Sequence, residues 1–277
     1  MTPALSPAAP PVAVQVPRPR PVWRRLPPGP ARQTVFAVLL ILVWQALSQW
    51  WVQNSSLLPS PVVVLGRAAE LTLGGELPRD MATSLGRILV GYVTGAALGT
   101  ALGLVMGRLP GLETLLGPSL GFVRSIPPIA LVPFSIIVFG IGEASKYAII
   151  VYLVGIVLAL SAAAGVRETP RIRIRAAQAL GAGGLTVLVK VVLPSALPFI
   201  LSGLRVGLNL AFMAVVSAEL IGARGGLGRM IMDSQTMFET DRMVVGILAL
   251  GVLGAVLDRG ADLVIRRALG RFTHQAA

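Results

Sequence analysis

Residues 175–198 read RAAQALGAGGLTVLVKVVLPSALP, and this stretch decides how the chain is organised. It lies between two long apolar runs and combines basic side chains with a glycine-rich turn at 181–184 and a Leu193-Pro194 pair. An apolar run needs no such interruption merely to cross lipid. The pattern therefore predicts two short helices that lie outside a bilayer, the second of which ends at Leu193-Pro194.

Composition places the chain in a membrane. The mean hydropathy is +0.79, 55% of the residues are hydrophobic and 13% are charged. This leaves too little polar surface for a soluble globule. Charge lies between the apolar runs, so the net charge of +12 does not indicate nucleic-acid binding. The chain has no cysteine, and its one histidine, His274, lies in the C-terminal tail. The sequence therefore excludes a thiol nucleophile and a cysteine-based metal site, and it leaves a single histidine for any other metal or acid–base chemistry.

Six apolar runs have the length needed to cross a hydrocarbon core, which is about 20 residues. We expect spans near residues 35–52, 86–107, 119–141, 147–166, 200–221 and 243–263. This predicts an all-α membrane protein with six transmembrane helices.

The remaining segments divide the chain around these spans. Residues 1–33 are rich in proline and arginine and lack apolar periodicity, which predicts a disordered tail. We expect a first helix with its outer loop over 34–79, the main membrane domain over 80–266 and a short tail over 267–277. A cleaved signal peptide is the alternative for the first run. That run is longer than the hydrophobic region of a signal peptide, however, and no cleavage site of the small-x-small type follows at 49–54.

Basic residues predict the orientation. The N-terminal tail, the segment 167–190 and the C-terminal tail are all rich in arginine, and with six spans they fall on one side. The opposite loops are balanced or acidic, so the rule that positive loops stay inside places both termini in the cytoplasm. The basic residues are Arg18, Arg20, Arg24, Arg25 and Arg32, then Arg167, Arg171, Arg173, Arg175 and Lys190, then Arg266, Arg267 and Arg271.

Glycines recur every fourth residue in the second span, at Gly91, Gly95, Gly99, Gly103 and Gly107. Successive glycines at this spacing trace a shallow groove along a helix, where another helix can approach closely. Gly203 and Gly207 repeat the spacing in the fifth span. Close packing is the simpler interpretation, and helix sliding during a conformational cycle is the alternative.

Polar groups within the spans suggest a pathway. Pro127, Pro128 and Pro133 break the third span, and Arg124 precedes the break. The fifth span carries Ser202, Arg205 and Asn209 on one helical face, flanked by Glu219 nearer the outer end. Ionisable groups inside a membrane normally face the interior of the bundle. These side chains either form static bonds between helices or line a pathway for a solute.

The loop at 175–194 resembles the EAA loop of type I ATP-binding-cassette (ABC) importer permeases. Ala176 and Ala177 are followed four residues later by Gly181, and Leu193-Pro194 comes twelve residues after that glycine. The family's glutamate falls at Arg175, which is a departure from the pattern. Three further runs resemble the nitrate, sulfonate and taurine branch in matching order: VRSIPPIALVP at 123–133, FGIGEASK at 139–146 and AELIGARGGLG at 218–228.

The resemblance implies the type I permease fold over about 80–266 and a short cytoplasmic helix that docks on a partner ATPase. The small Ala176 and Ala177 would give a close contact, Gly181 would allow the chain to reverse, and Leu193-Pro194 would end the second helix. The alternative is an amphipathic helix bound to anionic lipid. The implied complex holds two permeases, an ABC ATPase that binds ATP and Mg, and an extracytoplasmic substrate-binding protein, in the cytoplasmic (inner) membrane of a bacterium. It involves membrane lipid and no nucleic acid.

The sequence thus predicts a non-catalytic permease subunit of an ATP-driven importer. It contains no GxxxxGK[ST] phosphate loop, so ATP hydrolysis must come from a partner. An ion-coupled secondary transporter is the alternative, although such proteins usually have more spans and carboxylates at the midplane. A membrane-embedded enzyme would need a catalytic cluster that the sequence does not offer. The resemblance implies a small solute such as a sulfonate, taurine or nitrate, and it leaves open whether the permeases form a homodimer or a heterodimer.

Overall fold

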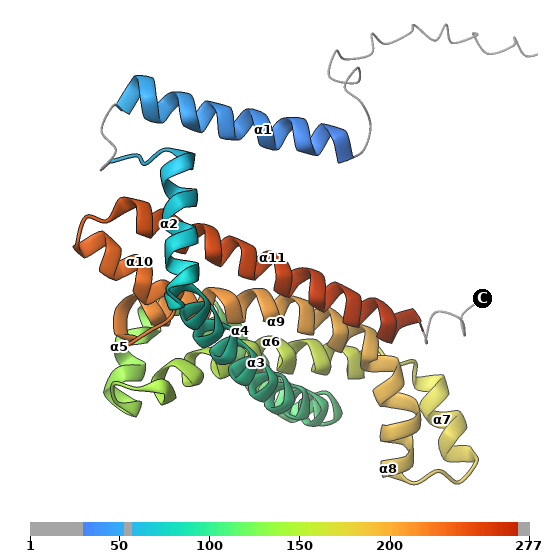
Figure 1. The fold of residues 1–277 in the computed structure, drawn as a ribbon. Coiled ribbons are helices and arrows are strands. Elements are labelled where there is room, and N and C mark those ends of the chain that lie inside the picture. The colour runs from blue at the N-terminus through green and yellow to red at the C-terminus, as the bar shows by residue number, and fades with distance from the viewer. Residues whose placement is uncertain (1–29, 53–56, 271–277) are drawn as a thin grey trace, which may run out of the picture.

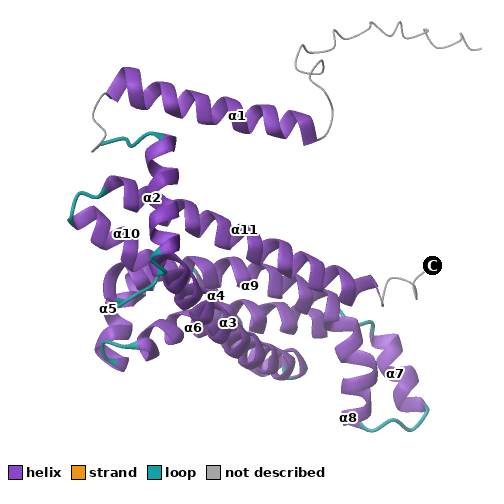
Figure 2. Ribbon diagram, viewed as in Figure 1, coloured by secondary structure: helices purple, strands orange, loops and turns teal. Residues whose placement is uncertain are grey.

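The computed structural model describes residues 30–52 and 57–270. Every regular element in these two ranges is a helix, which confirms the all-α fold (Figures 1 and 2). The helices are α1 (Pro30–Ala46) followed by a π-helix at Leu47–Val52, α2 (Pro61–Leu73), α3 (Glu76–Arg108), α4 (Pro110–Arg124), α5 (Pro128–Phe139), α6 (Glu143–Arg167), α7 (Arg171–Ala179), α8 (Gly184–Val187) followed by a π-helix at Leu188–Val192, α9 (Leu193–Gly222), α10 (Leu227–Thr236) and α11 (Thr240–Gly270).

Helix α6 forms the centre of the bundle. Its most apolar 18-residue window is 67% buried, whereas the corresponding windows of α3, α11 and the helix over Gly184–Gly222 are each 28% buried. It packs against α3 and against α9. The other long helices therefore surround α6, and most of their apolar side chains remain on the outside of the bundle, where lipid would contact them.

The glycines of α3 form its contact with α6. A Cβ atom on Gly91 would lie 2.6 Å from the side chain of Ile150, and Gly99 backs directly onto the backbone of Gly155. The same close approach occurs at the other glycines of the series, Gly95, Gly103 and Gly107. The prediction of close helix packing is confirmed, because no side chain fits between the two backbones here.

Helix α9 packs on a neighbouring face of α6 through the second pair of glycines. A Cβ atom on Gly203 would lie 2.7 Å from Ser161, and one on Gly207 would lie 3.0 Å from Leu158. The Tyr92 hydroxyl of α3 also donates a 2.9 Å hydrogen bond to the Leu204 carbonyl of α9. These contacts hold α3, α6 and α9 together as one core.

Among the described residues, four helices are long and apolar enough to cross a membrane: α3, α6, the continuous helix Gly184–Gly222, and α11 over Thr240–Ile265. They correspond to the second, fourth, fifth and sixth predicted spans. The third predicted span is a bent pair, α4 and α5, which gives a fifth crossing if the pair counts as one. The first predicted span falls on a shorter apolar helix, Thr34–Trp50, so the structure has four or five clear spans and a further candidate in α1.

The break in the third span lies where the prolines predict it. Helix α4 ends at Arg124, α5 begins at Pro128, and their axes differ by 105°. Pro127 takes an extended ψ of 136°, as expected for a residue that precedes another proline. Pro133 lies within α5 without ending it.

The terminal segments differ in part from the prediction. Residues 1–29 and 271–277 lie outside the described residues, so the predicted tails are described only at 30–33 and 267–270. Both of these stretches are helical. Pro30 suits the first turn of a helix because the amide hydrogen that it lacks has no partner there. Helices α1 and α11 therefore extend a few residues past the predicted boundaries, and the division of the chain at residues 33 and 267 stays a prediction.

The outer loop expected before the second span contains helix α2. Its hydroxyl cap, Ser60, accepts a hydrogen bond from the Val63 N–H at 3.4 Å, and Pro61 occupies the first turn. Two hydrogen bonds tie this region to α1 and to the π-helix after it: the Trp44 indole donates to the Pro59 carbonyl at 3.1 Å, and the Ser48 hydroxyl donates to the Leu58 carbonyl at 2.8 Å. Figure 1 shows α1 lying apart from the core, joined to it through α2.

The bundle has two distinct ends. Helices α7 and α8 project from one end, and α10 lies at the other, beside the start of α3 (Figure 1). At 1.5 Å per residue, the 33 residues of α3 extend about 50 Å, which exceeds a hydrocarbon core of about 30 Å. Part of α3 must therefore stand outside the lipid.

Candidate functional site

The projecting loop is built on a capped helix. At the end of α7, the Gly181 N–H donates to the Gln178 carbonyl at 2.9 Å and the Ala182 N–H donates to the Ala177 carbonyl at 3.0 Å. This pair of bonds is a Schellman motif, which needs a residue with positive φ at its centre. Gly181 has a φ of +83°. The predicted chain reversal at Gly181 is confirmed, and it depends on the lack of a side chain there.

The two alanines of the loop face different surroundings. Ala177 is half-buried and packs on the core, together with Ile174 and Ala182. Ala176 is exposed, and so is Arg175. Ala177 therefore supports the loop from within, whereas Ala176 lies on a surface that a partner could reach.

Large apolar side chains are exposed around the same loop. Ile172 of α7 is 72% exposed, Leu180 in the turn is 88% exposed and Leu185 of α8 is 74% exposed. Apolar side chains rarely gather on a surface that faces only water. This part of the loop therefore offers a contact surface, bordered by Arg171, Arg173 and Arg175.

The predicted helix end at Leu193-Pro194 is wrong. Helix α8 continues through the π-helix Leu188–Val192 into α9 without a break, and the three form one helix over Gly184–Gly222. The Leu193 N–H reaches back five residues to the Leu188 carbonyl. This wider turn directly before Pro194 accommodates a residue that cannot donate a backbone hydrogen bond. The second short helix is thus continuous with the helix of the fifth span.

The loop is also tied to the rest of the bundle. The Arg108 guanidinium at the end of α3 donates a 2.9 Å hydrogen bond to the Gly184 carbonyl at the start of α8. Val187 and Val192 are buried against the core. The projecting element is therefore connected to α3 as well as to α9.

Three of the pathway candidates share one face of α9. Ser202, Arg205 and Asn209 are all exposed in a single copy of the chain. The structure adds two acids from α11 that the sequence reading did not single out. Arg205 pairs with Asp262 at 2.9 Å, and Asn209 and Asp258 line a small cavity of about 260 Å³ between the two helices. The sequence did contain a sign of these acids, because their spacing of four residues places both on one face of the helix within the sixth span.

Arg124 lies apart from this face. It is exposed at the end of α4, directly before the 105° bend. In the described part of the chain, no hydrogen bond or ion pair joins its side chain to α9. The structure therefore does not bring the first pathway candidate together with the others.

Glu219, the fifth pathway candidate, lies in a closed polar network. Its carboxylate is fully buried and accepts hydrogen bonds from the Arg87 guanidinium at 2.7 Å, the Ser84 hydroxyl at 2.9 Å and the Gly228 N–H at 2.9 Å. Arg87 is itself buried and forms a bidentate pair with Glu143, at 2.6 and 2.7 Å. The network thus links α3, α6 and α9, and it does not include the Ser202, Arg205 and Asn209 face.

This network explains why the run AELIGARGGLG at 218–228 has glycines at positions 226 and 228. Gly226 has a φ of +110°, and a Cβ atom there would lie 2.7 Å from the Arg87 guanidinium. A Cβ atom on Gly228 would lie 2.6 Å from Glu219. The backbone of the run is fixed by two α3 side chains: Asp80 accepts from the Gly226 N–H at 2.9 Å and Ser84 from the Leu227 N–H at 3.0 Å. The glycines are therefore needed for the loop to close over the buried ion pair.

Comparisons with known proteins agree on one family. Residues 95–270 match the family model described as the binding-protein-dependent transport system inner membrane component. The chain is 36% identical over 236 residues to the taurine transport system permease protein TauC of Escherichia coli, covering 83% of this chain and 85% of that protein. It is 35% identical over 240 residues to a probable ABC transporter permease protein of Brucella melitensis, covering 86% and 98% respectively.

The fold is also that of solved importer structures. An inward-facing structure of the MetNI methionine ABC transporter superposes with a TM-score of 0.61 at 23% identity, covering 71% of this chain and 97% of that chain. Membership of the family implies a separate ATPase and a substrate-binding protein as partners. With its several apolar helices, the chain belongs to the binding-protein-dependent transport system inner membrane components, as a multi-pass, non-catalytic permease subunit of an ABC importer.

Proposed function

We propose that the chain forms the translocation pathway of an importer for a small solute with an anionic group, such as a sulfonate, taurine or nitrate. The single observation that carries this proposal is the capped α7 loop with its exposed apolar side chains, which continues without a break into α9. Among its relatives, TauC of E. coli is a taurine transport permease, a Bacillus subtilis protein at 32% identity is a putative aliphatic sulfonates permease, and a Synechocystis protein at 29% is a nitrate import permease.

The loop would transmit energy from the ATPase. In this proposal α7 and the turn after it dock on the partner ATPase, which binds ATP and Mg. Exposed Ala176 allows close approach, and Leu180 supplies apolar contact. Arg175 replaces the acid of the family pattern, so the partner surface would carry a matching negative charge at that position.

The exposed polar face of α9 favours an assembly of two copies. Arg205 and Asn209 would be costly against lipid, and a second copy placed on this face would enclose them around a central pathway. The homodimer is the simplest assembly. Asp258 and Asp262 of α11 would then line the same pathway near its cytoplasmic end.

The charge pattern supports an orientation for this assembly. The arginine-rich α7 loop would lie in the cytoplasm with both termini. The start of α3 and helix α10, at the opposite end of the bundle, would face the binding protein (Figure 1).

Uptake into proteoliposomes tests this function. The chain, its ATPase and its binding protein are reconstituted together, and uptake of radiolabelled taurine, ethanesulfonate and nitrate is measured with and without ATP on the ATPase side. We expect uptake of at least one of these solutes that needs ATP, the binding protein and this chain. Uptake that is driven by an ion gradient and abolished by an ionophore would instead show the secondary transporter that the sequence left open.

A further inference from the structure

Two large apolar side chains, Met237 and Phe238, lie at the turn between α10 and α11. Met237 is 66% exposed and Phe238 is 86% exposed. Figure 1 shows this turn at the end of the bundle opposite α7 and α8. Single apolar side chains are often exposed in proteins, so the exposure of this pair needs a second observation before it indicates a contact.

The backbone of Phe238 supplies that observation. Its φ is +59°, and among the described residues it is the only residue other than glycine with a positive φ. The Phe238 N–H donates to the Gln235 carbonyl at 3.3 Å and the Glu239 N–H donates to the Ser234 carbonyl at 2.9 Å, so α10 ends in a Schellman motif. Helix α7 ends in the same motif with Gly181 at the corresponding position. The sequence thus places a large side chain where a glycine would fit without strain.

Nothing in a single copy of the chain offsets this strain. A phenylalanine in this conformation costs folding free energy relative to glycine, and a ring that is 86% exposed makes too few contacts to compensate. Residues that are held in rare backbone conformations gather at functional sites. A contact outside this copy of the chain would explain why the position carries a phenylalanine.

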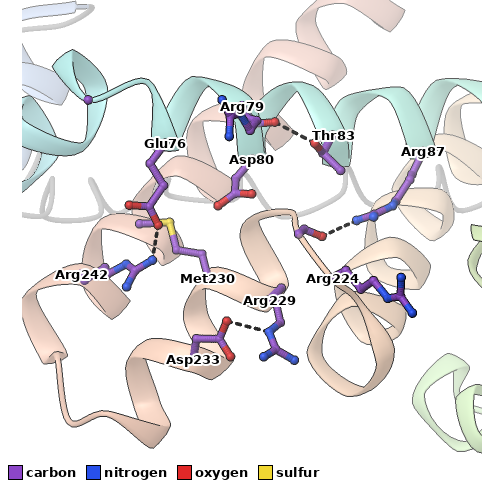
Figure 3. Close-up of a pocket in the computed structure, with 12 residues that line it drawn as sticks. Glu76, Arg79, Asp80, Thr83, Arg87, Arg224, Arg229, Met230, Asp233 and Arg242 are labelled. Carbon is purple, nitrogen blue, oxygen red and sulfur yellow. Dashed lines mark hydrogen bonds and ion pairs between the residues drawn. The ribbon is translucent and has the colours of Figure 1, made fainter. Parts of the chain in front are cut away.

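Charged side chains border the turn, and they pair with one another. Asp233 pairs with Arg229 at 2.6 Å, and Arg242 pairs with Glu76 (Figure 3). Arg242 also pairs with Glu239 at 3.1 Å. The turn therefore has an apolar centre with a polar rim whose charges are neutralised, and this composition is typical of a contact between proteins.

The same charges disfavour a lipid surface as the partner. A segment that lies on a membrane usually carries an excess of lysine and arginine beside its apolar side chains. Residues 229–242 contain three acids, two arginines and no lysine. The segment therefore has no excess of positive charge to attract anionic headgroups, which favours a protein as the partner.

We propose that Phe238, with Met237 beside it, anchors the substrate-binding protein on the outer end of the permease by inserting its ring into an apolar pocket of that protein. An aromatic side chain at the centre of a polar rim often carries much of the binding energy of an interface. Membership of the family implies such a partner. The assignment of this end of the bundle to the outer side rests on the proposed function.

Variants at Phe238 separate the contact from the fold. The chain is assembled with its ATPase in lipid nanodiscs, and the affinity for the immobilised binding protein and the melting temperature are measured. Phe238→Gly removes the ring and the strain together, so it should lower the affinity by about tenfold or more while the melting temperature stays equal or rises. Phe238→Tyr should keep the affinity. The control Val256→Ala, at an exposed apolar position further along α11, should bind as the native chain does.

A label at the same position identifies what the ring contacts. The native chain has no thiol, so Phe238→Cys can carry a single environment-sensitive fluorophore. We expect the emission of a hydrated label from the complex alone, and a shift to the emission of an apolar environment when the binding protein is added. Quenching by brominated lipid before that addition would place the label in the membrane. An apolar emission without such quenching would place it against a second copy of the chain, and either outcome would overturn the proposal.

The remaining outcomes separate this contact from the proposed function. Equal affinity of Phe238→Gly and the native chain, or no measurable affinity of the native complex, would overturn the contact. A fall in affinity together with a fall in melting temperature would show a structural role and overturn it as well. ATP-driven uptake by Phe238→Gly that matches the native complex at limiting binding protein contradicts the contact alone. A native complex that binds through Phe238 and takes up none of the solutes contradicts the proposed function alone.

Discussion

At the scale of single residues, the buried pair of Arg87 and Glu219 is the most constrained feature of the chain. Each side chain is almost or fully enclosed, and each needs the other because an unpaired charge in such a place is strongly unfavourable. Ser84 and the Gly228 N–H complete the coordination of the carboxylate. We infer that Glu219 positions the loop after α9 and leaves the lining of the pathway to the exposed polar face of α9.

The variant Glu219→Gln should destabilise the protein strongly. It keeps the shape of the side chain but removes the buried carboxylate to which Arg87 donates, so that Arg87 keeps only the exposed Glu143, and the loss of a hydrogen bond between charged groups costs about 1.5 to 3 kcal/mol. Thermal unfolding in detergent, followed by size-exclusion chromatography, measures the effect. The control Glu168→Gln, at an exposed position without an ion pair among the described residues, should unfold as the native protein does. Equal stability of the two variants would show that the network does not hold the fold.

At the scale of elements, the sequence predicts those features that depend on local pattern. Apolar length locates α3, α6, α9 and α11, and the glycine series predicts the close contact that α3 makes with α6. The Leu193-Pro194 boundary was wrong because a proline ends a helix only if the preceding turn cannot adapt, and here a π-helix does so. The partner of Glu219 could not be predicted, because Arg87 lies 132 residues away and only the packing of α3 beside α9 brings them together.

Substitution in the α3 glycine series should separate two helices. In Gly99→Ala the new methyl group meets the backbone of Gly155, which cannot move aside as a side chain could. Overpacking of this kind costs about 1 to 3 kcal/mol. The control Gly86→Ala lies in the same helix with no atom within 4 Å of the added carbon, and should be neutral or stabilising. Thermal stability in detergent compares the two, and a Gly99→Ala variant as stable as Gly86→Ala would contradict the close contact.

The turn after α7 gives a second matched pair of variants. Gly181→Ala forces a side chain into a φ of +83°, whereas Gly183→Ala occupies a φ of −69° with open space around it. We expect strain of about 1 kcal/mol or more in the first variant and none in the second. Affinity for the ATPase, measured on the permease in nanodiscs, should fall only for Gly181→Ala. A similar fall for both variants would place the effect outside the backbone reversal.

At the scale of the whole molecule, a single copy leaves a polar face of α9 uncovered. Ser202, Arg205 and Asn209 are exposed, and Asp258 and Asp262 of α11 lie beside them. A lipid environment would make this face unfavourable, and a second copy would convert it into an aqueous pathway. The energy for transport would reach this face through the helix that runs from α8 into α9.

Cysteine labelling tests that arrangement, because the native chain has no thiol. In the assembled complex, Arg205→Cys and Asn209→Cys should react with a membrane-permeant, water-soluble thiol reagent, at a rate that changes when ATP is added. The control Ala211→Cys lies about 120° from Arg205 and about 160° from Asn209 around α9, and it should react slowly because this position is fully buried. If the two polar positions stay unlabelled in every nucleotide state, these residues form static contacts and do not line a pathway.

The most direct test of the account is whether α7 couples ATP hydrolysis to the loaded binding protein. Hydrolysis by the reconstituted complex is measured with and without the solute-loaded binding protein, for the native chain, Ala176→Trp and the control Glu168→Gln. Ala176 is the cleaner position for a bulky substitution because Ala177 packs inward. We expect stimulated hydrolysis for the native chain and the control, and loss of the stimulation in Ala176→Trp without loss of membrane insertion. Full stimulation in Ala176→Trp, with the ATPase still bound, would contradict it.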